Sequence, residues 1–155
     1  MTKAGKLRAA TGLAAILVLS VVYLDYVFQL RTGVWLRSGL GDWIDPYLIN
    51  ALLEEWRYSV LHLANPVSPP MFFPEPGTLG YSHSLVLYAP FYVIARIVLQ
   101  PFVADTVTIL TVIEIGILSL YAIFRRFLAM GVVESLLLVT LFATSQNVIH
   151  PITGQ

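Results

Sequence analysis

A long apolar run near the N-terminus constrains this chain more than any other feature of its sequence. Residues 9–30 contain a single charged side chain, Asp25, close to their end. As a helix rising about 1.5 Å per residue, the run reaches about 33 Å, enough to cross the hydrocarbon core of a bilayer. A cleavable signal peptide would have a shorter apolar core and a small-residue cleavage site, but Tyr23, Asp25 and Tyr26 occupy that place. We therefore predict an uncleaved transmembrane helix over residues 9–30.

The basic residues that precede this run orient it. Residues 1–8 carry three positive charges, on Lys3, Lys6 and Arg8. Basic residues flanking a span remain on the cytoplasmic side of a membrane. The sequence therefore predicts a cytoplasmic N-terminus and places the chain after residue 30 outside.

The composition of the whole chain agrees with an integral membrane protein. Hydrophobic residues make up 57% of it and charged residues 12%, and its mean hydropathy is +0.78. Nine basic and nine acidic residues leave no net charge, which disfavours a nucleic-acid partner. The chain has no cysteine, which excludes disulfides, thiolate metal sites and cysteine nucleophiles. Any metal must therefore bind oxygen or histidine ligands.

Three more apolar runs follow, and they differ in length. Residues 106–126 and 132–150 are each long enough to form a transmembrane helix. The run 84–99 would reach only about 24 Å as a helix, and it contains Pro90 and Arg96. We expect this shorter run to lie on the membrane surface.

The adjacent residues Arg125 and Arg126 favour the same topology. If residues 84–99 crossed the membrane, this basic pair would lie outside, against the usual bias of basic residues toward the cytoplasm. With residues 84–99 on the outer surface, the pair falls inside. The sequence therefore predicts an all-α integral membrane protein with three transmembrane helices. Residues 31–105 form its extracytoplasmic loop with two interfacial helices, and its C-terminus emerges outside.

The first interfacial helix is predicted near residues 45–63. It begins at Asp45, whose carboxylate can accept the free N–H groups of a first turn and which is followed by a proline. One apolar stripe then recurs at helical spacing: Ile49, Leu52, Leu53, Trp56, Val60 and Leu63. We expect the other face, with Asn50, Glu54 and Arg57, to be solvated, and Glu54 and Arg57 to form an ion pair.

The outer loop resembles a known family in two of its segments. Residues 45–57, DPYLINALLEEWR, and 72–82, FFPEPGTLGYS, resemble the first outer loop of bacterial GT-C-type membrane glycosyltransferases. Residues 120–126, LYAIFRR, are similar to the end of their second span. The resemblance covers roughly residues 41–155. It implies the N-terminal part of a many-span plasma-membrane enzyme that transfers a sugar from a polyprenyl-phosphate donor on the outer face. Because such enzymes have more spans than three, we expect a truncated protein, inactive alone.

The resemblance and the residue chemistry together give candidate site residues. Asp45 matches an acidic residue at the start of the family's surface helix, and its carboxylate can act as a general base. Asp42 is the candidate second carboxylate, or a ligand with Asp45 for Mg or Mn. Asp45 can equally be only a helix cap, and Asp42 a solvated turn residue. The candidates for contacts with the phosphate or the sugar are Arg37, Arg57, Tyr81, His83 and His150.

Polar residues within the predicted spans leave two other functions open. Glu114 lies near the centre of the second span, where a carboxylate marks an interior face, and we expect its partner in the missing part of the truncated chain. In the third span a polar stripe is predicted to face other helices; its members are Thr140, Thr144 and Asn147. The alternatives to a transferase are a non-catalytic membrane subunit and, with Glu114 as the key charge, a transporter subunit. Near the outer end of span one, aromatic residues are expected as interfacial anchors: Tyr23, Tyr26, Trp35 and Trp43.

Overall fold

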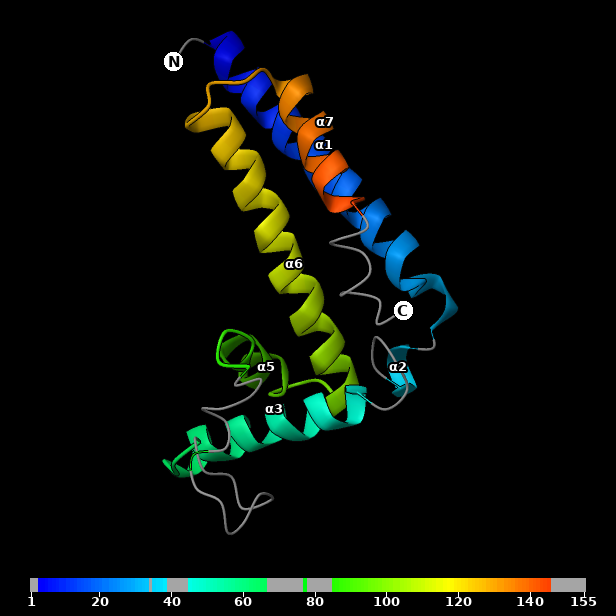
Figure 1. Cartoon of the computed structure of the whole chain (residues 1–155), viewed down its shortest axis with the longest axis vertical. Helices are drawn as coiled ribbons and strands as arrows, with labels where there is room; N and C mark the ends of the chain where they lie inside the picture. The colour runs from blue at the N-terminus through cyan, green and yellow to red at the C-terminus, as the bar shows by residue number, and fades with distance from the viewer. Residues whose placement is uncertain (1–2, 34, 39–44, 67–76, 78–84, 146–155) are drawn as a thin grey trace. The chain divides into compact units, whose positions relative to one another are not determined.

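The computed structural model describes most of the chain as helices (Figure 1). The described residues are 3–33, 35–38, 45–66, 77 and 85–145. Their elements, in order, are α1 (Lys3–Phe28), a 3₁₀ turn (Leu30–Thr32), α2 (Trp35–Ser38), α3 (Asp45–His62), α5 (Ala89–Ala95), α6 (Pro101–Arg126) and α7 (Val132–Ala143). No strand occurs among these residues, so the all-helical prediction is confirmed for them.

Two of the helices are long and apolar enough to cross a membrane. These spans are Ala10–Phe28, with 19 residues, and Pro101–Arg126, with 26 residues. The second begins five residues before the predicted start at 106, because Pro101 opens the helix and the Ala104 N–H already donates to the Gln100 carbonyl at 2.8 Å. These two helices support the prediction of an integral membrane protein.

The third predicted span is only partly covered by the structure. The described helix, α7, has 12 residues. At about 1.5 Å per residue it reaches about 18 Å, less than a bilayer core. Residues 146–150 of the predicted span lie outside the described residues, so the third span stays a prediction.

The chain divides into two compact units, and the boundary between them falls within α6. Unit 1 comprises residues 1–33 and 112–155, and unit 2 comprises residues 34–111. In unit 1, α1, the C-terminal half of α6, and α7 surround a core of Ile16, Ile117, Tyr121 and Val139. α1 and α7 lie side by side (Figure 1).

One glycine allows close packing in unit 1. Gly12 is buried on α1, and a Cβ placed there would overlap the Tyr121 hydroxyl and lie 3.2 Å from a methyl group of Val132. By contrast, a Cβ at Gly116 would meet nothing within 4 Å. The side chains of α6 and α7 can therefore approach the α1 backbone only because residue 12 has no side chain.

In unit 2, α3 packs against α5 and the first turns of α6. The buried centre of this packing is Leu53, Tyr92 and Ala104. At one end the rings of Tyr47 and Phe102 meet edge to face, with centroids 5.4 Å apart. The first turn of α3 is thereby held against the first turn of α6.

The buried face of α3 differs from the predicted stripe. Leu52 and Leu53 are buried as expected, but Val60 is 52% exposed and Asn50, expected in solvent, is only 7% exposed. Leu63 lies beyond the helix end with a positive φ of 52°. The buried face of α3 is rotated because α5 packs on the Glu54 side of that helix. The local apolar pattern of the sequence does not reveal this packing partner.

α5 is also shorter than the helix expected over residues 84–99. Pro90 stands in its first turn, where the ring suits the start of a helix, and turns precede and follow the helix. Residues 85–99 nevertheless form one compact segment, with Leu85, Tyr88, Ala95 and Leu99 packed against the core of unit 2.

Candidate functional site

The best-defined polar site among the described residues centres on Glu54 of α3. The Tyr92 hydroxyl of α5 donates to Glu54 Oε1 at 2.6 Å, and Arg96 Nε, one residue after α5, donates to the same oxygen. Arg57 Nη1 lies 3.4 Å from the other carboxylate oxygen, Oε2. Arg96 Nη1 also donates to the Leu99 carbonyl at 2.7 Å. The Glu54 carboxylate thus links α3 to Tyr92 and Arg96 of the 85–99 segment, and it also contacts Arg57 on its own helix.

The electrostatics of this cluster favour an ionised Glu54. Burial alone would raise the pKa of the Glu54 carboxyl, but the hydrogen bonds from Tyr92 and Arg96 and the charges of Arg96 and Arg57 outweigh it and lower the pKa. Burial, and then the hydrogen bond to Glu54, raise the pKa of Tyr92. The hydrogen bond with Glu54 raises the pKa of Arg96. With one carboxylate and two guanidinium groups, the cluster has a net charge of +1.

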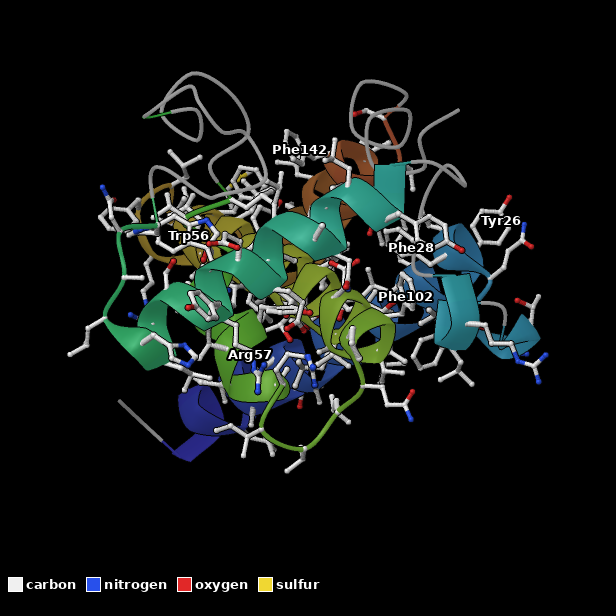
Figure 2. All side chains as sticks on the ribbon, turned by 90° about the horizontal axis from the view of Figure 1, so that it is seen from below. Tyr26, Phe28, Trp56, Arg57, Phe102 and Phe142 are labelled. Atoms are coloured by element: carbon white, nitrogen blue, oxygen red, sulfur yellow. The ribbon has the colours of Figure 1, made fainter. Side chains whose placement is uncertain are left out.

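Arg57 is the sequence candidate that the structure shows in most detail. Its side chain is 34% exposed, and its contact with Glu54 is long. Figure 2 shows Arg57 and Trp56 on different sides of α3. A guanidinium carries five N–H donors, so one 3.4 Å contact within the described part of the chain leaves Arg57 able to bind a further anion. Arg96, with its two hydrogen bonds and an 18% exposed side chain, is committed to the fold.

The other sequence candidates are only partly covered. α3 begins at Asp45, as the sequence predicts, but the Asp45 side chain lies outside the described residues. Arg37 lies on α2 and is exposed. Four further candidates fall outside the described residues altogether: Asp42, Tyr81, His83 and His150. The roles of these residues stay hypotheses.

The backbone of Asp45 can still be located relative to α6. Tyr47, two residues later, packs its ring on Phe102, the second residue of α6, at an interplanar angle of 83°. Because α6 is one of the two helices able to cross a membrane, the start of α3 lies beside the first turn of such a helix. Figure 2 shows Phe102 near the start of α3.

Sequence reasoning missed a buried carboxylate, that of Asp105. The residue is 1% exposed, and neither of its oxygens has a hydrogen-bond partner within the described part of the chain. The Nδ2 atom of Asn50 and the Oγ1 atom of Thr106 are also buried and unpaired there. Pro101 is the sequence signal that could have placed Asp105 in a helix, because proline suits the first turn. A helix that begins at Pro101 includes Asp105 in its second turn, whereas the predicted loop extends to residue 105.

A metal site finds no support among the described side chains. They contain no group of three or more His, Asp or Glu residues placed to hold an ion. The Mg or Mn ligands predicted from the sequence, Asp42 and Asp45, have side chains outside the described set. Metal binding therefore stays a hypothesis.

In unit 1, Glu114 finds its partner within the chain. Ser20 Oγ of α1 donates to Glu114 Oε1 at 2.9 Å, so the expectation of a partner in missing chain is wrong for this oxygen. The other oxygen, Oε2, is buried without a partner among the described residues. The Tyr23 hydroxyl donates to the Ala143 carbonyl at 2.6 Å and links α1 to α7.

In the described part of the third predicted span, Thr140 and Thr144 line a groove that α7 shares with α1 and α6. Thr140 and Thr144 are exposed, and their hydroxyls donate within α7, to the carbonyls of Leu136 and Thr140. Asn147 lies outside the described residues. Two open apolar grooves, of about 370 and 290 Å³, run between α1, α6 and α7, and Tyr23, Ile117, Val139 and Ala143 line both.

Tyr23 is thus an interhelix contact as well as a candidate anchor, whereas Tyr26 is 82% exposed, as an interfacial aromatic would be. Asp25 pairs with Arg31 at 2.6 Å, at the end of α1.

Comparison with known proteins finds no match to this chain among protein-family models, curated proteins or solved structures. The functional argument therefore rests on the residues themselves.

Proposed function

We propose that this chain works in a bacterial plasma-membrane glycosyltransferase of the GT-C type, which moves a sugar from a polyprenyl-phosphate donor to an acceptor on the outer face. The proposal begins from the resemblance of residues 45–57 and 72–82 to the first outer loop of that family. The membrane lipid surrounding the spans would present the donor to this loop.

The contact between Tyr47 and Phe102 supports the proposal most. It holds the first turn of α3, and with it the backbone of Asp45, against the start of an apolar helix able to cross a membrane. A lipid-linked sugar phosphate presents its reacting carbon at the membrane surface, so the base must stand at that level. A phosphate is a good leaving group, and positioning plus proton removal is the main work left to the protein.

In this proposal Asp45 removes the proton from the acceptor. Arg57 lies 12 residues later on α3, about 18 Å along the helix axis, so its proposed role is to bind the donor phosphate as the lipid arrives, before the transfer step at Asp45. Arg57 suits the second role because its guanidinium is partly exposed and has donors left after its contact with Glu54. Glu54 would position Arg57 without touching the substrate. Asp42, Tyr81, His83 and His150 remain candidates for the second carboxylate and for sugar or phosphate contacts.

Binding of the donor lipid is the first test. The protein in liposomes is titrated with radiolabelled polyprenyl phosphate and, separately, with the same polyprenol lacking phosphate. We expect saturable binding of the phosphate form only, weakened about 10-fold or more by Arg57→Met, because a hydrogen bond to a charged group contributes about 1.5–3 kcal/mol. The matched control, Glu55→Gln, should bind normally. Equal binding of both lipids, or an unchanged affinity in Arg57→Met, would argue for a non-catalytic membrane subunit.

The catalytic role of Asp45 has its own test. With a polyprenyl-phosphate sugar bound, Asp45→Asn should retain the donor but release no sugar to an acceptor, since the amide cannot take a proton. Loss of binding and transfer together would show that Asp45 acts only as the cap of α3.

The proposed topology is tested by labelling in intact cells. The chain has no native cysteine, so Ser82→Cys and Met130→Cys each carry one thiol. A membrane-impermeant reagent should label residue 82 and leave residue 130 unlabelled. Labelling at residue 130 would reverse the proposed orientation.

A further inference from the structure

One end of unit 1 gathers basic residues from two helices. Residues 1–12 and 121–134 contain five basic residues and a single acidic one, Glu134. The basic residues stand at the start of α1 and at the end of α6: Lys3, Lys6, Arg8, Arg125 and Arg126. We call these five residues the basic end.

Helix packing brings the two groups of basic residues together. A Cβ on Gly12 of α1 would overlap the Tyr121 hydroxyl of α6 and lie 3.2 Å from a methyl group of Val132 of α7. Arg8 lies one turn before Gly12 on α1, and Arg125 lies one turn after Tyr121 on α6. Figure 1 shows the start of α1, the end of α6 and the start of α7 at the same end of unit 1. The backbone therefore places all five basic residues at one end of this unit.

The positive charge of the basic end is not balanced within the described part of the chain. Arg126 is exposed and forms no ion pair with a described side chain. Arg125 Nη1 donates to the Met130 carbonyl, an uncharged partner. The Glu134 carboxylate lies over Gly131, where a Cβ would overlap it, and so stands at the N-terminus of its own helix, α7. The basic end can therefore attract an anion from outside the chain.

Apolar side chains beside the arginines indicate which anion fits. Phe127 and Leu128 directly follow Arg126 and are 82% and 59% exposed. The helix that they follow, α6, is one of the two able to cross a membrane. A soluble anion such as inorganic phosphate would gain nothing from these two side chains, whereas a phospholipid presents a charged phosphate and apolar chains together.

We propose that the basic end binds the headgroups of anionic phospholipids, with Phe127 and Leu128 between the first carbons of their acyl chains. The described residues at the opposite end of unit 1 have no such charge excess, because Arg31 is paired with Asp25 at 2.6 Å. This inference does not depend on the transferase proposal. It uses only residues of unit 1 and requires no assignment of the two sides of the membrane.

Quenching by labelled lipids tests the proposal. The chain has no cysteine, so Leu128→Cys gives a single site for a bimane fluorophore at the basic end, and Tyr26→Cys gives one at the exposed opposite end. The labelled full chain is placed in phosphatidylcholine liposomes. A small fraction of phosphatidylglycerol or of phosphatidylcholine, each carrying a doxyl group close to its headgroup, is added, and the quenching by the two lipids is compared.

We expect phosphatidylglycerol to quench the fluorophore at residue 128 about 3-fold or more better than phosphatidylcholine, because basic residues near the surface attract anionic lipid. At residue 26 the two lipids should quench equally. Adding Arg126→Gln to the Leu128→Cys chain should reduce the preference by about half or more. The matched control, Arg31→Gln, removes the same charge from the opposite end and should leave the preference at residue 128 unchanged.

Three results would overturn the proposal. Equal quenching by the two lipids at residue 128 would show that the basic end does not select anionic lipid. Equal effects of Arg126→Gln and Arg31→Gln would indicate a general effect of charge instead of a site. Weak quenching by both lipids at residue 128, compared with residue 26, would show that protein covers the basic end.

Discussion

Replacing Glu54 with glutamine removes the charge at the centre of the unit 2 cluster while keeping its size and its carbonyl acceptor. Tyr92 can still donate to the amide oxygen, so the main loss is the charged interaction with Arg96. The side chains of Arg96 and Glu54 are 18% and 31% exposed, between an exposed pair worth about 0–1 kcal/mol and a fully buried pair costing about 3–5 kcal/mol to break. The longer contact with Arg57 adds only about 0.3 kcal/mol.

We therefore expect Glu54→Gln to lower the free energy of unfolding by about 2 kcal/mol. For a chain of this length the loss corresponds to a fall of about 4–8 °C in the unfolding midpoint. The assay is thermal unfolding in detergent, followed by tryptophan fluorescence, since Trp56 is close in the sequence to both Glu54 and Arg57.

Two controls separate the ion pair from a general charge effect. Glu55→Gln removes the same charge from the next residue, which forms no ion pair with any described side chain, and should change the stability by less than about 0.5 kcal/mol. Combining Glu54→Gln with Arg96→Met should cost less than the sum of the two single changes, with a coupling energy of about 1–2 kcal/mol. Equal midpoints for Glu54→Gln and Glu55→Gln, or additive effects with Arg96→Met, would refute the reasoning.

Three further predictions follow from charge and packing. The folded-state pKa of Glu54 lies below its ordinary 4.5, so the stabilising effect of its charge is complete above pH 4.5 and is lost as the pH falls through the folded-state pKa. Between pH 6 and pH 3, the unfolding midpoint of the unmodified chain should therefore fall further than the midpoint of the Glu54→Gln variant. Asp105→Asn replaces a buried carboxylate that has no described partner, and should raise stability at neutral pH by about 1 kcal/mol; a loss of stability instead would indicate that the carboxylate binds a group outside the described residues. Gly12→Leu should destabilise unit 1 by about 1–3 kcal/mol, whereas Gly116→Leu, which meets open space, should not; similar midpoints for the two would contradict the packing described here.

The elements of the fold were more predictable than their packing. Apolar runs and the Asp-Pro start at residue 45 are local signals, and the structure has helices at those places. The buried side of α3 was not predictable in the same way. Asn50 is buried and Val60 exposed because α5 packs on the Glu54 side, and that contact joins residues 38 to 42 positions apart.

In the candidate site too, contacts within one helix were predictable from the sequence and contacts between helices were not. The pairing of Glu54 with Arg57 follows from their spacing of three residues on one helix, and the structure has it. The larger part of the cluster, from Tyr92 and Arg96, could not be found from spacing, because it depends on how two separate helices meet. Asp105 differs for another reason: the predicted loop ends at residue 105, whereas the helix that begins at Pro101 already includes this residue.

The long-range hydrogen bonds of α1 have a consequence for the order of events during synthesis. Ser20 bonds a residue 94 positions later, and Tyr23 bonds one 120 positions later. At about 5–20 residues per second, α1 must wait roughly 5–25 s before both of its partners have been made. Every contact of the Glu54 cluster, by contrast, is complete once the ribosome has passed Leu99. Unit 2 can therefore fold first. Meanwhile α1 remains in the bilayer, where the hydroxyls of Ser20 and Tyr23 still lack these partners and can form hydrogen bonds with any other helix.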